Sequence, residues 1–281
     1  MSEVISKMSA PFAAPHAVSA EAAARAVPGR LWLSRVFTFC WLELVKIRHD
    51  RTELYTRAIQ PILWLLIFGE TFSRIRAIPT GSVPYLDYLA PGIIAQSALF
   101  VAIFYGIQII WERDFGILTR MLATPTPRPA LISGKAFGAS VRAIAQALAV
   151  LLLSIVLRVH LQLNPFHWLL ALLVIVLGSA FFSTLSMTIA GIVLTRERLM
   201  GIGQAITMPL FFASNALYPV ALMPGWLQVL SRINPLSYEV EALRGLLVGT
   251  PTNLWLDFAV LAVAAALGIA TAAALLDRLA R

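Results

Sequence analysis

Charge is scarce in this sequence, and cysteine is almost absent. Charged residues make up 13% of the 281 residues, where a soluble domain typically has about 25%. The single cysteine, Cys40, has no second cysteine to pair with, which excludes an internally disulfide-bonded secreted scaffold. Hydrophobic residues reach 59%, so an ordinary globular enzyme and a disordered chain are excluded as well. The composition indicates a protein that crosses a membrane several times.

Patterns for nucleotide binding, metal binding and catalysis are also missing. The only Gly-Lys pair, Gly134-Lys135, has Pro129 where a P-loop needs its first glycine, and Ala136 follows the lysine. The four histidines show neither i,i+4 pairing nor an acidic partner at ligand spacing. We therefore expect no catalytic residue, no metal site and no cofactor in this chain.

Six mainly apolar stretches are long enough to cross a hydrocarbon layer of about 30 Å. They run approximately over residues 54–72, 86–110, 133–157, 168–194, 201–220 and 254–276. They predict an all-α integral membrane protein with six transmembrane helices. The net charge of +8 then marks contacts with membrane lipids, and we expect no nucleic-acid partner.

The segment before the first stretch has two parts. Residues 1–30 are rich in Ala, Pro and Ser, lack a signal-peptide pattern and predict a mobile cytoplasmic tail. Residues 31–52 predict an amphipathic helix that lies in the headgroup plane with its aromatic side toward the hydrocarbon. The alternative is a helix packed on soluble protein. The polar stripe of this helix comprises Arg35, Thr38, Glu43, Lys46, His49 and Asp50.

The distribution of basic residues predicts the orientation. With a cytoplasmic N-terminus, 17 of the 22 Lys and Arg residues fall on the inner side and 5 on the outer side. Six crossings return the C-terminus to the cytoplasm. We expect a multi-pass protein of the bacterial inner membrane with both termini inside.

Few ionisable residues lie within the expected spans. The acids Glu70 and Asp257 are near outer ends, which argues against a chain of proton-relay carboxylates. Lys135, Arg142 and Gln146 share one face of the third expected helix. Two interpretations of this face stay open: it lines a cytoplasm-facing cavity or a subunit contact, or it is a helix end that snorkels to the headgroups.

A short charged segment separates the second and third expected spans. The charged start of 111–125, the apolar Phe115, Leu118 and Leu122, and the stop at Pro125 predict a short cytoplasmic helix. On this pattern alone it is a connecting helix. The segment also resembles the cytoplasmic motif of ABC type-2 transporter permeases, in which charged residues precede a glycine and a Leu-Ala-Thr-Pro end. The resemblance implies a coupling helix seated on an ATPase subunit and formed by Glu112, Arg113, Asp114, Phe115, Gly116, Leu118, Thr119, Leu122 and Pro125.

The region before the last span carries a second part of the resemblance. Residues 226–233 are apolar but too short to cross, Asn234-Pro235 interrupts them, and 238–247 can form another short helix. This pattern predicts two extracellular re-entrant half-helices. The segment is similar to the family's extracellular motif, with Asn234, Pro235, Tyr238, Glu241 and Arg244 as its residues. The resemblance covers about residues 31–279, with 53–281 as the ABC type-2 transmembrane domain, and looks most like the daunorubicin-resistance and nodulation-factor exporters.

The resemblance implies the permease subunit of an ATP-driven exporter. Two separate ATPase subunits would bind ATP and magnesium, and a second permease, either an identical copy, which is favoured, or a paralogue, would complete the path. The cargo would be amphipathic and drug-like or lipid-like, or alternatively a lipo-oligosaccharide or polysaccharide. Candidate path residues, of which the last four are alternatively packing residues, are Arg142, Gln146, Phe211, Phe212, Asn215 and Tyr218. An ion-coupled or facilitative carrier and a non-transporting scaffold are the alternatives of other classes.

Overall fold

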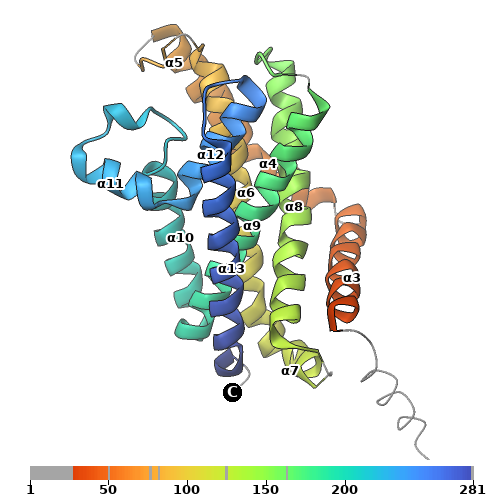
Figure 1. Ribbon diagram of the computed structural model, residues 1–281. Helices are drawn as coiled ribbons and strands as arrows, with labels where there is room; N and C mark the ends of the chain where they lie inside the picture. The colour runs from red at the N-terminus through yellow and green to blue at the C-terminus, as the bar shows by residue number, and fades with distance from the viewer. Residues whose placement is uncertain are drawn as a thin grey trace, which may run out of the picture.

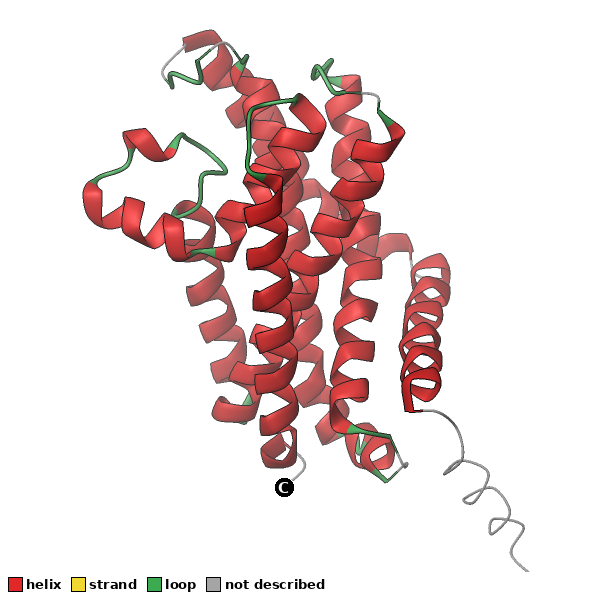
Figure 2. Cartoon of the chain, viewed as in Figure 1, coloured by secondary structure: helices red, strands yellow, loops and turns green. Residues whose placement is uncertain are grey.

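The computed structural model describes residues 28–49, 51–75, 78–81, 83–123, 126–162 and 164–279, and in these ranges the chain forms helices and no strand (Figure 2). Four long helices stand side by side in a bundle (Figure 1). In the described part of the chain, these four are long and apolar enough to cross a membrane. They are α6 (Tyr85–Asp114), α8 (Arg128–Val156), α9 (Pro165–Val193) and α13 (Leu254–Leu279).

Helix α6 is the centre of the bundle and is buried along most of its length. It packs against α8 and α9, and small residues allow these contacts to be close. A Cβ on Gly106 would meet the backbone oxygen of Ser183 and the side chain of Ser186 on α9. Lipid gives no hydrophobic force between helices, so van der Waals contact of this kind holds them together.

The first expected span, 54–72, is helical throughout and contains a π-helical turn. Helix α4 (Arg51–Leu63), the π-helical turn η1 (Trp64–Phe68) and α5 (Gly69–Ile75) follow one another without a gap. Pro61 lies inside α4 and has no amide hydrogen to donate, and the π turn begins three residues later.

The fifth expected span, 201–220, is helical only in its first part. Helix α10 (Arg196–Phe212) ends at Phe212, earlier than predicted. Residues 213–217 continue as buried irregular backbone. Their carbonyl oxygens find donors elsewhere in the bundle, since the Tyr85 hydroxyl donates to Leu217 over 3.2 Å and the Tyr88 hydroxyl donates to Asn215 over 3.0 Å. Buried non-helical backbone is stable where the protein supplies such partners.

The two ends of the bundle carry different short helices (Figure 1). Helix α7 (Ile117–Leu122) and the last turn of α13 lie at one end, which we call the α7 end. The opposite end, the α12 end, carries the 3-10 turn η2 (Val220–Leu222), α11 (Gly225–Ile233) and α12 (Pro235–Val248). The predicted break between two short helices is therefore confirmed at Asn234.

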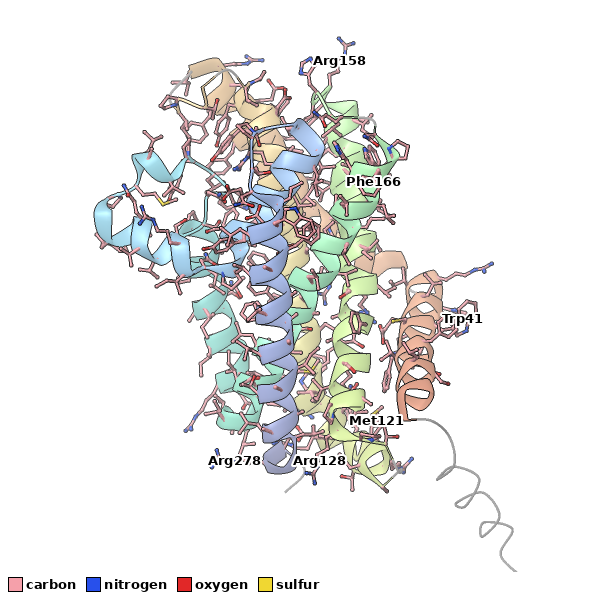
Figure 3. The ribbon with its side chains drawn as sticks, in the orientation of Figure 1. Trp41, Met121, Arg128, Arg158, Phe166 and Arg278 are labelled. Atoms are coloured by element: carbon pink, nitrogen blue, oxygen red, sulfur yellow. The ribbon has the colours of Figure 1, made fainter. Side chains whose placement is uncertain are left out.

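Three arginines can be placed at the two ends of the bundle. Arg128 and Arg278 lie at the α7 end with Met121, whereas Arg158 lies at the α12 end with Phe166 (Figure 3). The orientation predicted from the sequence counts Arg128 and Arg278 among the 17 inner basic residues and Arg158 among the 5 outer ones.

Helix α3 (Pro28–His49) begins inside the expected tail, at Pro28, and residues 1–27 lie outside the described residues. It packs alongside α8 (Figure 1). Its polar stripe does not all face solvent, because Glu43 is buried against α8. Large apolar side chains point outward instead, and Trp41 projects away from the bundle (Figure 3). Helix α3 therefore packs the Glu43 carboxylate against the bundle and exposes aromatic side chains such as Trp41 on its other face.

The close packing of α6 on α9 predicts opposite effects for two Gly→Ala substitutions. Gly106→Ala should lower the unfolding temperature in detergent by several degrees, because the new methyl group meets backbone that cannot move aside. Gly201→Ala on α10 meets open space and should leave stability unchanged or raise it by up to about 1 kcal/mol, because alanine favours helix. Equal unfolding temperatures for the two variants would contradict the close contact between Gly106 of α6 and the backbone of α9.

Candidate functional site

An ion-pair network ties together three helices at the α7 end. Asp114, the last residue of α6, accepts hydrogen bonds from Arg113, with Nη2 at 2.8 Å, and from Nε of Arg196 on α10 at 2.6 Å. The Nη1 of Arg113 donates to the carbonyl oxygen of Leu194, just after α9, over 3.0 Å. One carboxylate and its partners therefore hold the ends of α6, α9 and α10 together.

A second ion pair fixes the same end of α6 to α8. The Glu112 carboxylate accepts a hydrogen bond from the ammonium of Lys135, whose side chain is almost fully buried. Lys135 was one of the residues placed on a common face of the third expected helix, and its partner was not predicted. The pair gives α6 two anchors within three residues, Glu112 and Asp114.

The chain turns sharply between α6 and α7. Gly116 has a φ of +69°, in the left-handed region that favours glycine, and its position precedes the first residue of α7. The expected single helix over 111–125 is therefore two pieces, since Glu112 to Asp114 complete α6. Pro125 lies outside the described residues.

Helix α7 and the turn before it expose apolar side chains, and a buried leucine anchors the helix to the bundle. Leu118 is fully buried and anchors the helix, whereas the Phe115 side chain is 70% exposed and Ile117 is 42% exposed. The Arg196 guanidinium lies 5.7 Å from the centre of the Phe115 ring, so the network also supports this ring. Thr119 is exposed and Leu122 is partly buried. We call the surface made by Phe115, Ile117 and Thr119 the α7 platform.

A buried arginine dominates the α12 end. Arg244 of α12 is 6% exposed, and its Nη2 donates to the carbonyl oxygen of Asn215 over 2.9 Å. Its Nε donates to the carbonyl oxygen of Tyr88 over 3.3 Å, and the guanidinium lies 3.7 Å from the centre of the Tyr88 ring. Arg244 therefore joins α12, α6 and the irregular backbone after α10, and we call this contact the Arg244 lock.

The other residues of the predicted extracellular motif have local roles. The Asn234 side chain caps α12 by accepting from the Leu236 amide over 3.0 Å, and its Nδ2 donates to the carbonyl oxygen of Leu210 on α10 over 2.6 Å. Pro235 is the first residue of α12, where a proline costs no hydrogen bond. The Tyr238 hydroxyl donates to the Arg232 carbonyl, and Glu241 lies beside the loop 251–253 and the first residues of α13.

The six candidate path residues separate into three places. Four of them gather where α10 ends: Phe211 is buried against Trp64, Asn215 is buried, and the Tyr218 hydroxyl donates to the Phe212 carbonyl over 2.7 Å. The other two lie on α8, in separate surroundings.

Arg142 pairs with α3. Its Nε donates to Oε2 of Glu43 over 2.6 Å, and its guanidinium lies 5.5 Å from the centre of the Tyr105 ring. Neither interpretation of this residue from the sequence foresaw an ion pair inside the chain, because the partner lies 99 residues earlier.

Gln146 lines a cavity of about 350 Å³ between α4, α6 and α8. Sequence reasoning missed the other polar residues of its wall, Thr56, Arg57, Gln60, Gln96 and Ser97. Each lies within an otherwise apolar stretch or beside one, and no pattern in the sequence brings them together.

The burial of two acids, Glu43 and Glu239, was not predicted. Burial raises the pKa of Glu43, but hydrogen bonds from Lys46 and Arg142 lower it by more, so the net shift is downward. Glu239 of α12 is fully buried beside Gly178 of α9, and neither carboxyl oxygen has a hydrogen-bond partner among the described residues. In the same part of the chain, no three His, Cys, Asp or Glu residues form a group that could hold a metal ion.

Comparison with known sequences decides the family. The model of the ABC-2 type transporter family matches residues 34–248, from the first turns of α3 to the end of α12. The chain belongs to the ABC-2 type transporter family. It is therefore a multi-pass membrane protein of the transporter permease class, and permeases of this family normally work with ABC ATPase subunits.

Three relatives show how far the similarity extends. The ycf38 protein of Cyanophora paradoxa, described as a transport permease, is 30% identical over 219 residues, which cover 76% of this chain and 74% of the relative. The daunorubicin resistance ABC transporter permease protein DrrB1 of Streptomyces coeruleorubidus is 26% identical, covering 84% and 82%. Nodulation protein J of Rhizobium leguminosarum bv. viciae is 28% identical, covering 78% and 84%.

The Arg244 lock predicts a stability loss on removal of the guanidinium. Arg244→Met keeps an apolar chain of similar length but takes a donor from the Asn215 and Tyr88 carbonyls, so we expect a loss of about 1–3 kcal/mol. Arg232→Met, on the exposed face of α11, is the matched control and should change little. Thermal unfolding in detergent measures both variants. Similar unfolding temperatures for the two would show that the Arg244 lock does not stabilise the fold.

The Glu43 ion pair predicts a pH-dependent difference. Because its pKa is lowered in the folded protein, the pair stabilises the fold at neutral pH, and this contribution is lost as the pH falls through the folded-state pKa. Glu43→Gln should therefore lower the free energy of unfolding by about 3 kcal/mol at pH 7. In acid, the difference in stability between the variant and the unaltered protein should become smaller. Glu70→Gln, at an exposed acid, should show no such narrowing in a pH series of unfolding temperatures. A stability difference between Glu43→Gln and the unaltered protein that stays constant with pH would contradict the stabilising role of the Glu43 ion pair.

Proposed function

We propose that this chain is the membrane subunit of an ATP-driven exporter that moves an amphipathic, drug-like or lipid-like molecule out of the cytoplasm or the inner leaflet. The α7 platform carries this proposal, because it offers exposed apolar side chains on a base that two ion pairs and a buried leucine hold in place. Such a surface suits docking of a partner protein better than a loop that only connects two spans.

The proposed topology has six crossings. The continuous helical stretch α4–η1–α5, about 37 Å long, is the first crossing, and α10 with the irregular backbone after it is the fifth. Helices α11 and α12 dip into the outer leaflet as re-entrant half-helices. The α7 end and both termini are cytoplasmic in the bacterial inner membrane, the amphipathic segment 31–52 forms most of α3 alongside α8, and 53–281 form the transmembrane domain.

The proposed mechanism transmits force through α6. Two separate ATPase subunits bind ATP and magnesium and close against the α7 platforms of two permease copies, which we take to be identical. The load passes from Leu118 and Asp114 into α6, α10 and α8. At the far end, α6 carries Tyr85 and Tyr88, which hold the backbone after α10, so a shift of α6 alters the outer opening.

A drug-like cargo is favoured by the apolar and aromatic side chains near the end of α10 and by the relative that is named for daunorubicin resistance. Export of a lipo-oligosaccharide or polysaccharide by the same mechanism is the alternative.

Two exposed aromatic residues at opposite ends of the bundle test the coupling. Phe115→Ala should reduce ATPase stimulation and ATP-dependent transport at least about tenfold without lowering the unfolding temperature, because this ring is 70% exposed. Trp226→Ala removes a ring that is 67% exposed on α11 and should leave ATPase binding unchanged. Purification of the tagged chain with its ATPase, followed by ATPase assays in proteoliposomes, measures both.

The same preparation separates the three functional classes. An exporter subunit moves cargo uphill only with the ATPase and ATP. Uphill movement by the chain alone in an ion gradient would establish an ion-coupled carrier instead. Stable association with other membrane proteins, with neither ATPase nor transport, would establish a scaffold.

A further inference from the structure

Glu239 of α12 is more isolated than any other described acid. Four of the described acidic side chains are buried, and two of them, Glu43 and Asp87, are paired with a basic side chain. Asp257 has one buried carboxyl oxygen without a hydrogen-bond partner, whereas both oxygens of Glu239 lack a partner among the described residues. Glu239 is also 0% exposed. Its carboxyl group is therefore separated from water and from every described hydrogen-bond donor.

The carboxyl group of Glu239 lies against the backbone of α9. A Cβ atom on Gly178 would overlap the Cδ atom and both carboxyl oxygens, so the glycine leaves the space that the acid occupies. Val174 and Phe182 lie one turn before and one turn after Gly178 on the same face of α9, and both are fully buried. The carboxyl group is therefore enclosed between two closely packed helices in apolar surroundings.

No described charged group is hydrogen-bonded to Glu239. Helices α6, α9, α11 and α13 pack against α12. At the α12 end, the other titratable or charged side chains of these five helices are Tyr85, Asp87, Tyr88, His167, Arg232, Tyr238, Glu241, Arg244 and Asp257. None of them shares a hydrogen bond with Glu239. Arg244, the buried cation among them, donates to the carbonyl oxygens of Asn215 and Tyr88 instead.

A fully buried glutamate that has no donor holds a proton. A carboxylate only accepts hydrogen bonds, and leaving it unpaired in apolar surroundings carries a large free-energy penalty. The neutral carboxylic acid avoids most of this penalty, so the group binds a proton at neutral pH. Leucine or methionine would fill a similar space with no electrostatic penalty, so the acid indicates a function that packing does not explain.

Helix α12 connects this carboxyl group to the Arg244 lock. Glu239 and Arg244 are five positions apart, which places them about 140° apart around the helix. Glu239 therefore faces α9, whereas Arg244 faces α6 and the irregular backbone after α10. A movement of α12 away from α9 therefore also displaces Arg244 from its partners.

We propose that Glu239 is a proton-binding site that controls the contact between α12 and α9. With the proton bound, the neutral carboxyl group packs on Gly178 and the α12 end is closed. When the proton passes to water at this end of the bundle, the carboxylate requires hydration, and α12 separates from α9 to provide it. That this separation opens the route for cargo rests on the proposed export function, whereas proton binding does not. In the proposed orientation, acid on the outer side of the membrane favours the closed state.

Infrared spectroscopy of the full-length chain in detergent tests the proton directly, because a protonated carboxyl group has a carbonyl band separate from those of carboxylates and amides. At pH 7 the unaltered protein should show this band, and Glu239→Gln should lose the intensity of one carboxyl group. Glu197→Gln, at an exposed acid on α10, should leave the band unchanged. Glu239→Met, which is also uncharged, provides a second variant if Glu239→Gln does not fold. Raising the pH should remove the Glu239 component in one reversible step.

Hydrogen–deuterium exchange tests the movement of α12. Above the midpoint of the infrared titration, peptides of α12 should exchange several-fold faster in the unaltered protein than in Glu239→Gln, because only the unaltered protein then carries the carboxylate. Below the midpoint, the two proteins should exchange equally. Comparison at the same pH removes the intrinsic effect of pH on exchange, and peptides of α7 at the opposite end of the bundle are the internal control.

A protonated-carboxyl band of equal size in the unaltered protein and in Glu239→Gln would overturn the proton-binding site. A band that persists until the protein unfolds at high pH, or equal exchange of α12 in the two proteins above the midpoint, would overturn the control of α12. These measurements need no ATPase, so their failure leaves the coupling role of Phe115 untouched. Conversely, loss of the coupling result would leave a proton-dependent movement without a transport role, and the two failures are therefore distinguishable.

Discussion

A chain inside hydrocarbon must satisfy its own backbone hydrogen bonds, and this constraint governs the α12 end of the protein. Helix α10 ends at Phe212, and the backbone that follows is irregular yet buried. It is tolerated because Tyr85, Tyr88 and Arg244 donate to its carbonyl oxygens. All three donors are supplied by α6 and α12, so the shape of this end depends on how those two helices sit against each other.

Helix α6 also ends in the charged network at the α7 end, so it connects the two ends of the bundle. Its last residues pair with Lys135 and Arg196, and its first turns carry the tyrosines that hold the far backbone. Apolar residues of the same size often stabilise a protein as well as a buried ion pair does, so the buried Lys135–Glu112 pair is consistent with a role in fixing geometry. The ion pairs are concentrated where α6, α8 and α10 meet α7. This placement agrees with a rigid region that transmits force from α7 to the bundle.

Local patterns in the sequence predicted much of this fold, and the failures share one cause. The long apolar stretches, the short helix before Asn234 and the capped helix after it follow from hydropathy and from turn chemistry, which neighbouring residues decide. The Glu43–Arg142 pair joins positions 99 residues apart, and no local pattern records it. The split between α6 and α7 depends on the positive φ of Gly116, which a glycine permits but does not require. The early end of α10 likewise depends on donors from other helices. The roles of the candidate site residues are a different matter, because geometry locates those side chains without showing what they bind.

The same helix that links the two ends also contacts α12, because Arg244 donates to the Tyr88 carbonyl oxygen and lies over the Tyr88 ring. A proton on Glu239, acting through α12, and a partner on the α7 platform would therefore both act on the position of α6. If each favours one of two positions of the helix, thermodynamic linkage requires that each changes the affinity of the other by the same factor. Proton binding and ATPase engagement then need no separate signal between them, because a single rigid element with two settings is sufficient. The close packing of Gly106 on Ser183 and Ser186 supports this account, since a tightly packed helix moves as a unit rather than bending locally.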